Sequence, residues 1–384
     1  MNALTTDLFR QLAEIHEGRC LSIYMPTHRA GQEVLRRQDH LVLKNVQKEV
    51  AKVLKSRGYD RVSIADFLLP IKIMIEDLDF WKYRSEGLAI LLAPGQKYVF
   101  DLPKPVGPFH VLAHEYYLRP LIPMLENQPH YHFLSLQLHQ VKLYEGKGST
   151  LSEVSIPHLP QQMEEVVGVD FEESSLSFHR QKMGGNPYTV YHGKGEWQED
   201  HKSEILAFCR SIDDAILSFL EQDGLPLFMA TTPELFSIYK EANHYRNLYP
   251  EPINRDGLPS SLAPVRQEIE RALSVDFKRK MAKKAGLIRQ FQSTDRVSTS
   301  WNELVQGAVS GRVESLFLEA DRETWGVFEK SKGEVRIHAE SNLGNTSLMN
   351  LAAIQVFLQG GEVFEAPLNE MPLPGYQANA LFRY

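Results

Sequence analysis

Apolar periodicity stops twice in this chain of 384 residues, and the two interruptions divide the chain into blocks. Residues 157–195 are polar and follow neither strand nor helix spacing, while residues 249–264 hold four prolines. A chain of this length is expected to form two or three domains, each with its own core. We therefore predict an N-terminal domain over residues 1–128, a middle domain over 129–262 and a C-terminal domain over 263–384.

The N-terminal domain is expected to be an α/β unit that contains a buried strand and a hairpin. Pro94-Gly95 separates two apolar runs, which is typical of a hairpin turn. The predicted elements are a strand at 20–25, helices at about 33–56 and 64–77, hairpin strands at 88–93 and 97–102, and a strand at 111–117.

Three strand-like runs joined by short turns open the middle domain and predict a meander. After the long polar interruption, order resumes with an amphipathic helix, a strand and a helix whose first residue is Pro233. The predicted elements are strands at 132–138, 141–145 and 151–156, a helix at about 199–220, a strand at 227–230 and a helix at 233–242.

The C-terminal domain is expected to be a small α/β sandwich. Its predicted elements are helices at about 265–285, 301–309 and 347–359, and strands at 313–319, 325–328, 335–338 and 379–384. The predicted fold class of the whole chain is α/β and α+β in three domains, with a mixed sheet in the middle domain.

Composition excludes several classes of protein. The net charge of −7 gives no overall attraction to nucleic acid, so any polyanion site has to be local. Cys20 and Cys209 are too few for a disulfide framework or a metal cluster, and the longest apolar run, residues 88–93, cannot span a bilayer. No nucleotide-binding or hydrolase motif occurs. We expect a cytoplasmic protein with no metal, cofactor, membrane or DNA partner.

Gly184-Gly185-Asn186 lies inside the first interruption. Adjacent glycines suit a backbone that approaches another molecule closely or adopts positive φ, and a loop of this length is either functional or disordered. Just before the glycines, His179, Arg180 and Lys182 are candidates for contact with RNA phosphates. The alternatives are an ordinary turn and ordinary loop polarity.

A row of cations follows one side of the first predicted helix. Arg37, Lys44, Lys48, Lys52 and Lys55 advance by seven, four, four and three residues, so they share less than one quarter of the helix circumference. Apolar residues occupy the opposite side; these are Leu35, Val42, Val46, Val50 and Val53. The row predicts an RNA-binding face, with an ordinary solvated helix face as the alternative.

Two further sets of residues are candidates for binding anions. Lys280, Lys283 and Lys284 cluster at the end of the predicted helix 265–285, where they either contact RNA or stabilise the negative end of the helix. His28 and Arg29 directly follow a strand, a position at which α/β proteins often bind ligands. We therefore consider them a candidate anion site.

Three short phrases and the order of the blocks resemble the archaeal and eukaryotic class-one release factor family, including Pelota and bacterial members. The phrases are Ser22-Ile23-Tyr24-Met25-Pro26-Thr27-His28, Val190-Tyr191-His192-Gly193-Lys194-Gly195 and Ala380-Leu381-Phe382-Arg383-Tyr384. The resemblance implies a middle domain whose Gly-Gly-Gln loop enters the peptidyl-transferase centre of the ribosome. It also implies a C-terminal αβα sandwich similar to kink-turn-binding ribosomal proteins.

Gly184, Gly185 and Asn186 fall where that loop is expected, so the resemblance makes them the catalytic candidates. Asn186 replaces the glutamine and is one methylene shorter, which retracts the amide by roughly 1 Å and lowers a rate by on the order of a hundredfold. Pro187 also removes a backbone donor. We therefore predict inefficient hydrolysis.

Two hypotheses follow from the resemblance, and a third stands outside it. The first is a non-hydrolytic factor that binds the ribosome, ribosomal RNA or tRNA in rescue, quality control or hibernation. The second is a peptidyl-tRNA ester hydrolase on stalled ribosomes. The third is an adaptor or ligand-binding protein without a ribosomal role. A translational GTPase partner and the oligomeric state are left open.

Overall fold

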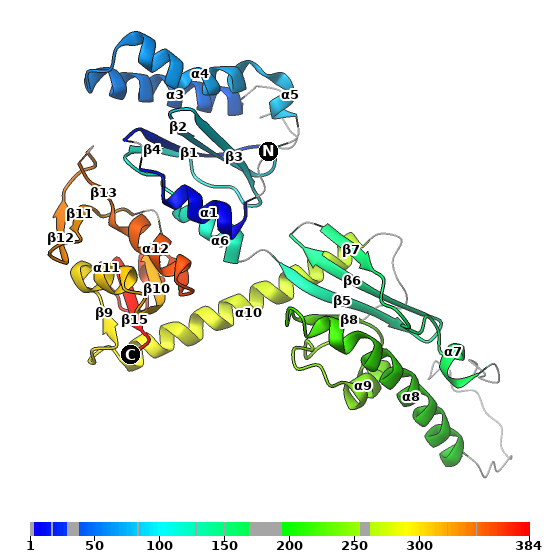
Figure 1. The fold of residues 1–384 in the computed structure, drawn as a ribbon. Coiled ribbons are helices and arrows are strands. Elements are labelled where there is room, and N and C mark those ends of the chain that lie inside the picture. The colour runs from blue at the N-terminus through cyan, green and yellow to red at the C-terminus, as the bar shows by residue number, and fades with distance from the viewer. Residues whose placement is uncertain are drawn as a thin grey trace, which may run out of the picture. The chain divides into compact units, whose positions relative to one another are not determined.

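The computed structural model describes the chain except residues 1–3, 17, 29–37, 83, 127–128, 149, 169–193, 254–261, 321 and 343, and over 194–201 it describes the backbone only. The chain forms two compact units (Figure 1). One unit contains Met1–Asn127 together with Arg279–Tyr384, and the other contains Gln128–Lys278. The fold is mixed α/β with several sheets, as predicted.

The N-terminal segment of the first unit contains a four-stranded antiparallel sheet in the order β3-β2-β1-β4. The predicted central strand and the hairpin are confirmed, and Gly95 in the turn has φ 73°. The predicted strand 111–117 ends earlier, at Ala113. The strands are β1 (Cys20–Pro26), β2 (Gly87–Ala93), β3 (Gln96–Leu102) and β4 (Phe109–Ala113).

Helices α3 (Gln38–Ser56), α4 (Arg61–Glu76) and α5 (Leu78–Trp81) cover one face of this sheet (Figure 1). Leu43 and Val50 of α3 are fully buried and share a core with Ile23 and Ile90 of the sheet. Helix α1 (Thr6–Ala13) was not predicted from the sequence pattern. It packs against the other face of the sheet, in a separate hydrophobic core.

The C-terminal segment of the first unit contains a sheet in the order β14-β10-β15-β9, in which β14 is parallel to β10. Helices α11 and α12 match the predicted helices at 301–309 and 347–359. The elements are β9 (Val297–Ser298), α11 (Trp301–Val309), β10 (Val313–Glu319), α12 (Leu348–Leu358), β14 (Glu362–Ala366) and β15 (Ala378–Phe382).

A smaller sheet, in the order β12-β11-β13, accompanies these strands. It consists of β11 (Trp325–Glu329), β12 (Glu334–His338) and β13 (Thr346–Ser347). The two segments of the first unit share one hydrophobic core, in which the rings of Phe9 and Phe357 lie 5.1 Å apart. On the N-terminal side, the interface between the two segments includes the 3-10 turn Arg119–Leu121 and α6 (Ile122–Glu126).

The second unit is a sheet in the order β7-β6-β5-β8, with β5 and β8 parallel and the remaining pairs antiparallel. The predicted meander is confirmed, although α8 begins five residues before the predicted start at 199. The elements are β5 (His130–Gln137), β6 (Gln140–Lys147), β7 (Thr150–Val154), α7 (Glu164–Val167), α8 (Lys194–Leu220), β8 (Leu227–Ala230) and α9 (Pro233–Ala242).

Helices cover both faces of this second sheet. Phe208 and Ile212 of α8 belong to one core with Leu134 and Met229 of the strands. On the other face, the first turns of α10 (Ala263–Gln290) bury Val265 against aromatic strand residues. Within the described residues, every helix is too short or too polar to cross a lipid bilayer.

Candidate functional site

The candidate loop residues lie in the segment 169–193, outside the described residues. They are Gly184, Gly185, Asn186, His179, Arg180 and Lys182. The structure does describe the stem from which this segment departs and to which it returns. We define the stem as residues 159–168 together with the part of α8 that follows residue 201.

Backbone hydrogen bonds and apolar packing fix the stem to the sheet. The Met163 N–H donates to the Leu138 carbonyl at 2.7 Å, and the Val141 N–H donates to the Gln161 carbonyl at 2.8 Å. The Met163 side chain is fully buried in a core that includes Ile205 of α8. Helix α7, which precedes the segment, contacts α8, which follows it (Figure 1).

Two lysines near the stem are paired with carboxylates, and acidic residues are exposed beside them. Glu164 and Glu165 are exposed on α7. The Lys142 ammonium lies 3.0 Å from the Glu153 carboxylate, and the Lys202 ammonium lies 2.9 Å from Glu241. Lys142 and Lys202 are therefore engaged, whereas Arg210 of α8 is exposed.

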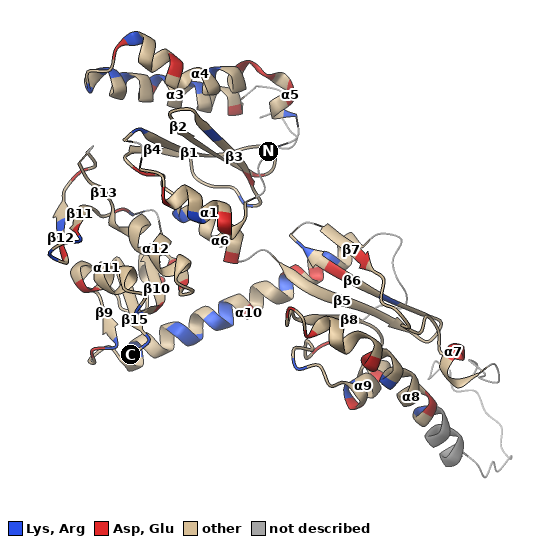
Figure 2. Cartoon of the chain, viewed as in Figure 1, with Lys and Arg blue, Asp and Glu red and all other residues tan. Residues whose placement is uncertain are grey.

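Helix α3 of the first unit carries exposed positive charge. Lys44, Lys48, Lys52 and Lys55 are all exposed, and none of them pairs with a carboxylate of a described residue. We call these four residues the lysine stripe, and Figure 2 shows it in blue along α3. Arg37, predicted to extend the row, lies outside the described residues.

Packing of the opposite side explains why the lysine stripe faces solvent. Leu43, Val46, Val50 and Leu54 are buried against the sheet. The prediction placed the apolar side of the helix slightly away from the side that is buried, since Val42 and Val53 of the predicted set are only half-buried. Leu35 lies outside the described residues.

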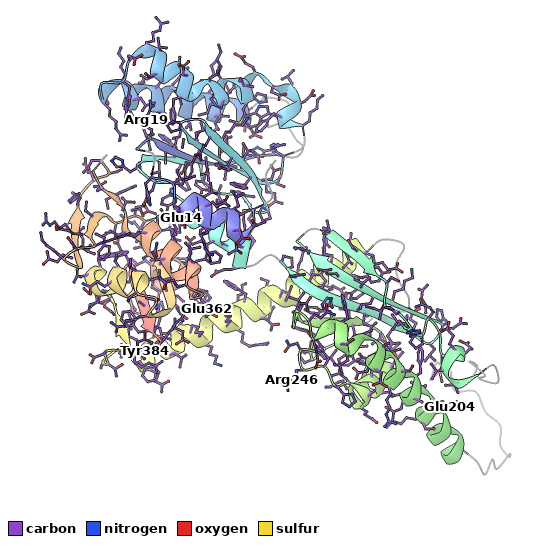
Figure 3. The ribbon with its side chains drawn as sticks, viewed as in Figure 1. Glu14, Arg19, Glu204, Arg246, Glu362 and Tyr384 are labelled. Carbon is purple, nitrogen blue, oxygen red and sulfur yellow. The ribbon has the colours of Figure 1, made fainter. Side chains whose placement is uncertain are left out.

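The basic cluster at the end of α10 is largely engaged in ion pairs within the first unit. Lys280 lies 2.6 Å from Glu362, and Lys284 lies 2.6 Å from Glu314 and 3.5 Å from Glu362 (Figure 3 labels Glu362). Burial lowers the pKa of Lys284, but its hydrogen bond to Glu314 and the Glu362 charge raise it more, so the net shift is upward. Lys283 is exposed and pairs with no carboxylate of a described residue.

At the predicted anion site, a carboxylate of the chain itself contacts His28. The His28 N–H donates to Oδ2 of Asp39 at 3.0 Å, and its ring Nδ1 lies 2.8 Å from Oδ1 of the same carboxylate. Asp39 is buried in the first turn of α3. The contact ties the end of β1 to α3, and Arg29 lies outside the described residues.

A buried polar cluster in the first unit was not predicted from the sequence. The Arg119 side chain is 6% exposed and lies 3.1 Å from Glu323 and 2.7 Å from Glu365. The Asn350 amide oxygen accepts the N–H groups of Leu118 and Arg119 at 2.7 and 3.0 Å. Burial raises the pKa of Glu323. These residues are distant in the sequence, so local periodicity carried no signal for the cluster.

Comparison with known proteins shows which family the second unit resembles. Residues 131–272 match the family described as bacterial archaeo-eukaryotic release factor family 7. Over these residues the chain is similar to bacterial members of the release-factor family. The match covers the sheet of the second unit, the stem, α8 and α9, and the first turns of α10, so the resemblance stated from the sequence is confirmed. None of the curated proteins compared with the chain matches it.

Several solved structures share a low level of similarity with this chain. The archaeal translation termination factor aRF1 is 12% identical, with 99% of each chain covered and a TM-score of 0.23. Archaeoglobus fulgidus Pelota is 9% identical, covers 100% of this chain and 94% of its own, and has a TM-score of 0.34. S. cerevisiae Dom34 is 11% identical, covers 76% of this chain and 74% of its own, and has a TM-score of 0.33. These scores are too low to support an argument about function.

Proposed function

We propose that this protein binds the ribosome or tRNA and acts without efficient hydrolysis in ribosome rescue, quality control or hibernation. The observation that carries the proposal is the lysine stripe: four exposed cations without described carboxylate partners, in a chain of net charge −7. The release-factor-like second unit supports the choice of the ribosome as the partner. A cytoplasmic location follows from that choice.

The geometry of the lysine stripe suits a phosphate backbone. From Lys44 to Lys55 the helix rises about 16 Å, so several phosphates fall within reach of one helix face. Each phosphate that a lysine neutralises releases a condensed counterion, which makes binding weaken steeply with salt. The ion pairs of Lys280 and Lys284 leave Lys283 as the more accessible contributor from α10.

Salt-dependent cosedimentation with ribosomes tests the proposal. We expect the wild-type chain to bind at low salt, and the triple variant Lys44→Glu, Lys48→Glu, Lys52→Glu to lose most of that binding. A matched control with the same change of charge replaces three exposed lysines elsewhere, Lys72→Glu, Lys104→Glu and Lys147→Glu. Equal loss in both variants, or binding of the wild type that does not respond to salt, would count against the lysine stripe.

A peptidyl-tRNA ester hydrolase is the second candidate function, and the retained Gly184 and Gly185 favour it. Asn186 and Pro187 argue against it, because the shorter amide and the missing backbone donor both displace the groups that would assist water. Release of labelled peptide from stalled ribosomes separates the two. Release that falls on Gly185→Ala would establish the hydrolase, whereas binding without release supports the non-hydrolytic factor.

The candidate with no ribosomal role is an adaptor or ligand-binding protein of the same fold. Affinity purification from cells entering starvation, scored for ribosomal RNA, distinguishes it from the other two. A preparation free of ribosomal RNA at low salt would favour the adaptor. Recovery of a translational GTPase in the same preparation would identify the partner that the sequence left open.

A further inference from the structure

Exposed apolar side chains gather on the helical layer of the N-terminal segment. Five of the twelve large apolar residues exposed in the described part of the chain lie on α3, α4 and α5. They are Leu41, Val62, Leu69, Ile73 and Leu78. Exposed apolar side chains that lie next to one another mark an interaction site more often than scattered single residues do.

Three of these residues form a line along α4. Val62, Leu69 and Ile73 are 68%, 49% and 54% exposed, and their spacing of seven and four residues places them on one side of the helix. We call them the α4 stripe. This spacing is the one with which a second helix interdigitates its own apolar side chains.

The α4 stripe borders a groove of about 520 Å³ between α4 and the β2–β3 turn. Phe67, Leu69 and Pro70 line the groove on the helix side, and Leu92 and Pro94 line it on the sheet side. Pro70 has no N–H, so the Asp66 carbonyl lacks its usual helical donor at this groove. These residues make the lining apolar over much of its extent.

Two cations also line the groove. The Arg19 guanidinium lies 4.8 Å from the centre of the Tyr59 ring and 5.6 Å from that of Phe67 (Figure 3 labels Arg19 beside the helical layer). Lys97 is exposed on β3. Neither cation forms an ion pair with a carboxylate of a described residue, whereas many surface lysines of this chain do. Asp66 is the acidic residue among those that line the groove.

We propose that the α4 stripe and this groove are the docking surface for one amphipathic helix of a partner protein, with acidic residues beside its apolar face. The apolar residues of that helix pack along Val62, Leu69 and Ile73. Its acidic residues meet Arg19 and Lys97, whose charges have no carboxylate partner in the described residues. The exposed apolar side chains of the α4 stripe favour a protein helix over a nucleic acid, which needs a predominantly polar, cationic surface.

A displayed library of random four-turn helical peptides, selected on the full-length protein, tests the docking surface. We expect selected peptides to carry an apolar row and acidic residues. Their affinity for the purified chain should fall about tenfold or more with Ile73→Lys, and should fall and lose its salt dependence with Arg19→Gln or Lys97→Gln. Ile337→Lys, at a residue that is 58% exposed on β12, is the matched control and should leave binding unchanged.

Several outcomes would overturn the proposal. Peptides selected equally well on Ile73→Lys would place binding elsewhere, and a preference for basic peptides would exclude the assigned role of Arg19 and Lys97. Concentration-dependent dimerisation that Ile73→Lys abolishes would assign the surface to a second copy of the chain. Ribosome cosedimentation is measured separately on Ile73→Lys, and its retention shows that the docking surface and the lysine stripe act independently.

Discussion

Nε of Arg119 lies 2.7 Å from Oε1 of Glu365, and this ion pair joins the N-terminal segment of the first unit to strand β14 of its C-terminal segment. Glu323 lies 3.1 Å from Nη1 on another side of the same guanidinium. Arg119 is 6% exposed, so its charge is removed from water and depends on the two carboxylates. Two segments separated by the entire second unit are thereby held in register.

Replacing Arg119 with methionine should destabilise the first unit by about 3–5 kcal/mol. The variant leaves two partly buried carboxylates without their cation, and an uncompensated buried charge is far more costly than a lost surface pair. Urea denaturation followed by circular dichroism measures the change. Lys82→Met, which breaks the exposed pair with Asp79, is the control and should leave the midpoint unchanged. A similar response of both variants would show that the Arg119 pairs contribute little.

Asn350→Ala should weaken the N-terminal and C-terminal segments together. The variant removes the acceptor for the N–H groups of Leu118 and Arg119, which become buried donors without partners. We expect a loss of about 1–3 kcal/mol. Native-state hydrogen exchange should show the opening free energy of β1 and of α12 falling by similar amounts, while α9 is unaffected. Exchange that changes in α12 alone would indicate that the two segments unfold separately.

Glu126 should make the first unit less stable as pH rises. Burial raises its pKa from 4.5 to about 7, although its bond from the Val363 N–H and the nearby Lys280 charge oppose the shift. Between these two pKa values the folded protein holds a proton that the unfolded chain has released, so stability falls with rising pH and is level above about 7.

The loss attributable to Glu126 amounts to at most about 3 kcal/mol. Denaturation of the wild type and Glu126→Gln at several pH values isolates this contribution. The difference in stability between the two proteins should change between pH 4.5 and 7 and remain constant above. A difference that is independent of pH would mean that Glu126 titrates normally.

Met163→Ala should loosen the stem of the segment 169–193. Met163 is fully buried between the sheet and α8, so its truncation leaves a cavity and costs about 2–5 kcal/mol. Val166→Ala, at a residue that is 37% exposed on α7, the helix that follows Met163, is the control. Thermal unfolding and the rate of limited proteolysis are the measurements. Equal effects of the two substitutions would show that the stem does not depend on Met163.

Local pattern was enough to predict the elements with strong periodicity or clear caps. Strand β8 and helices α9 and α11 have the predicted bounds because their apolar spacing, first-turn proline and turn residues are all local. Helix α1 and strand β14 were missed, because each is short and its apolar residues pack against distant parts of the chain. The lysine stripe was predicted because lysine spacing on a helix is also a local property.

The residues of a candidate site can be named from the sequence, whereas their partners depend on the fold. Lys280 and Lys284 belong to the same basic cluster as Lys283, but only the folded chain places Glu362 and Glu314 beside them. In the same way, His28 lies just after the end of a strand as predicted. Only the fold places the Asp39 carboxylate beside its backbone N–H and ring Nδ1. Contacts with residues distant in the sequence therefore decide whether a charged side chain is accessible to a ligand.

By itself, the sequence determined the type of most elements, the resemblance to release factors and the positions of the cationic residues, since each depends on residues within a few turns of one another. The tertiary structure alone decided that the first and last segments share a core and that Arg119 meets Glu323 and Glu365. These contacts join residues more than two hundred positions apart. Burial and charge pairing between residues so far apart in the sequence stabilise the fold, but they produce no periodic pattern in the sequence from which they could be predicted.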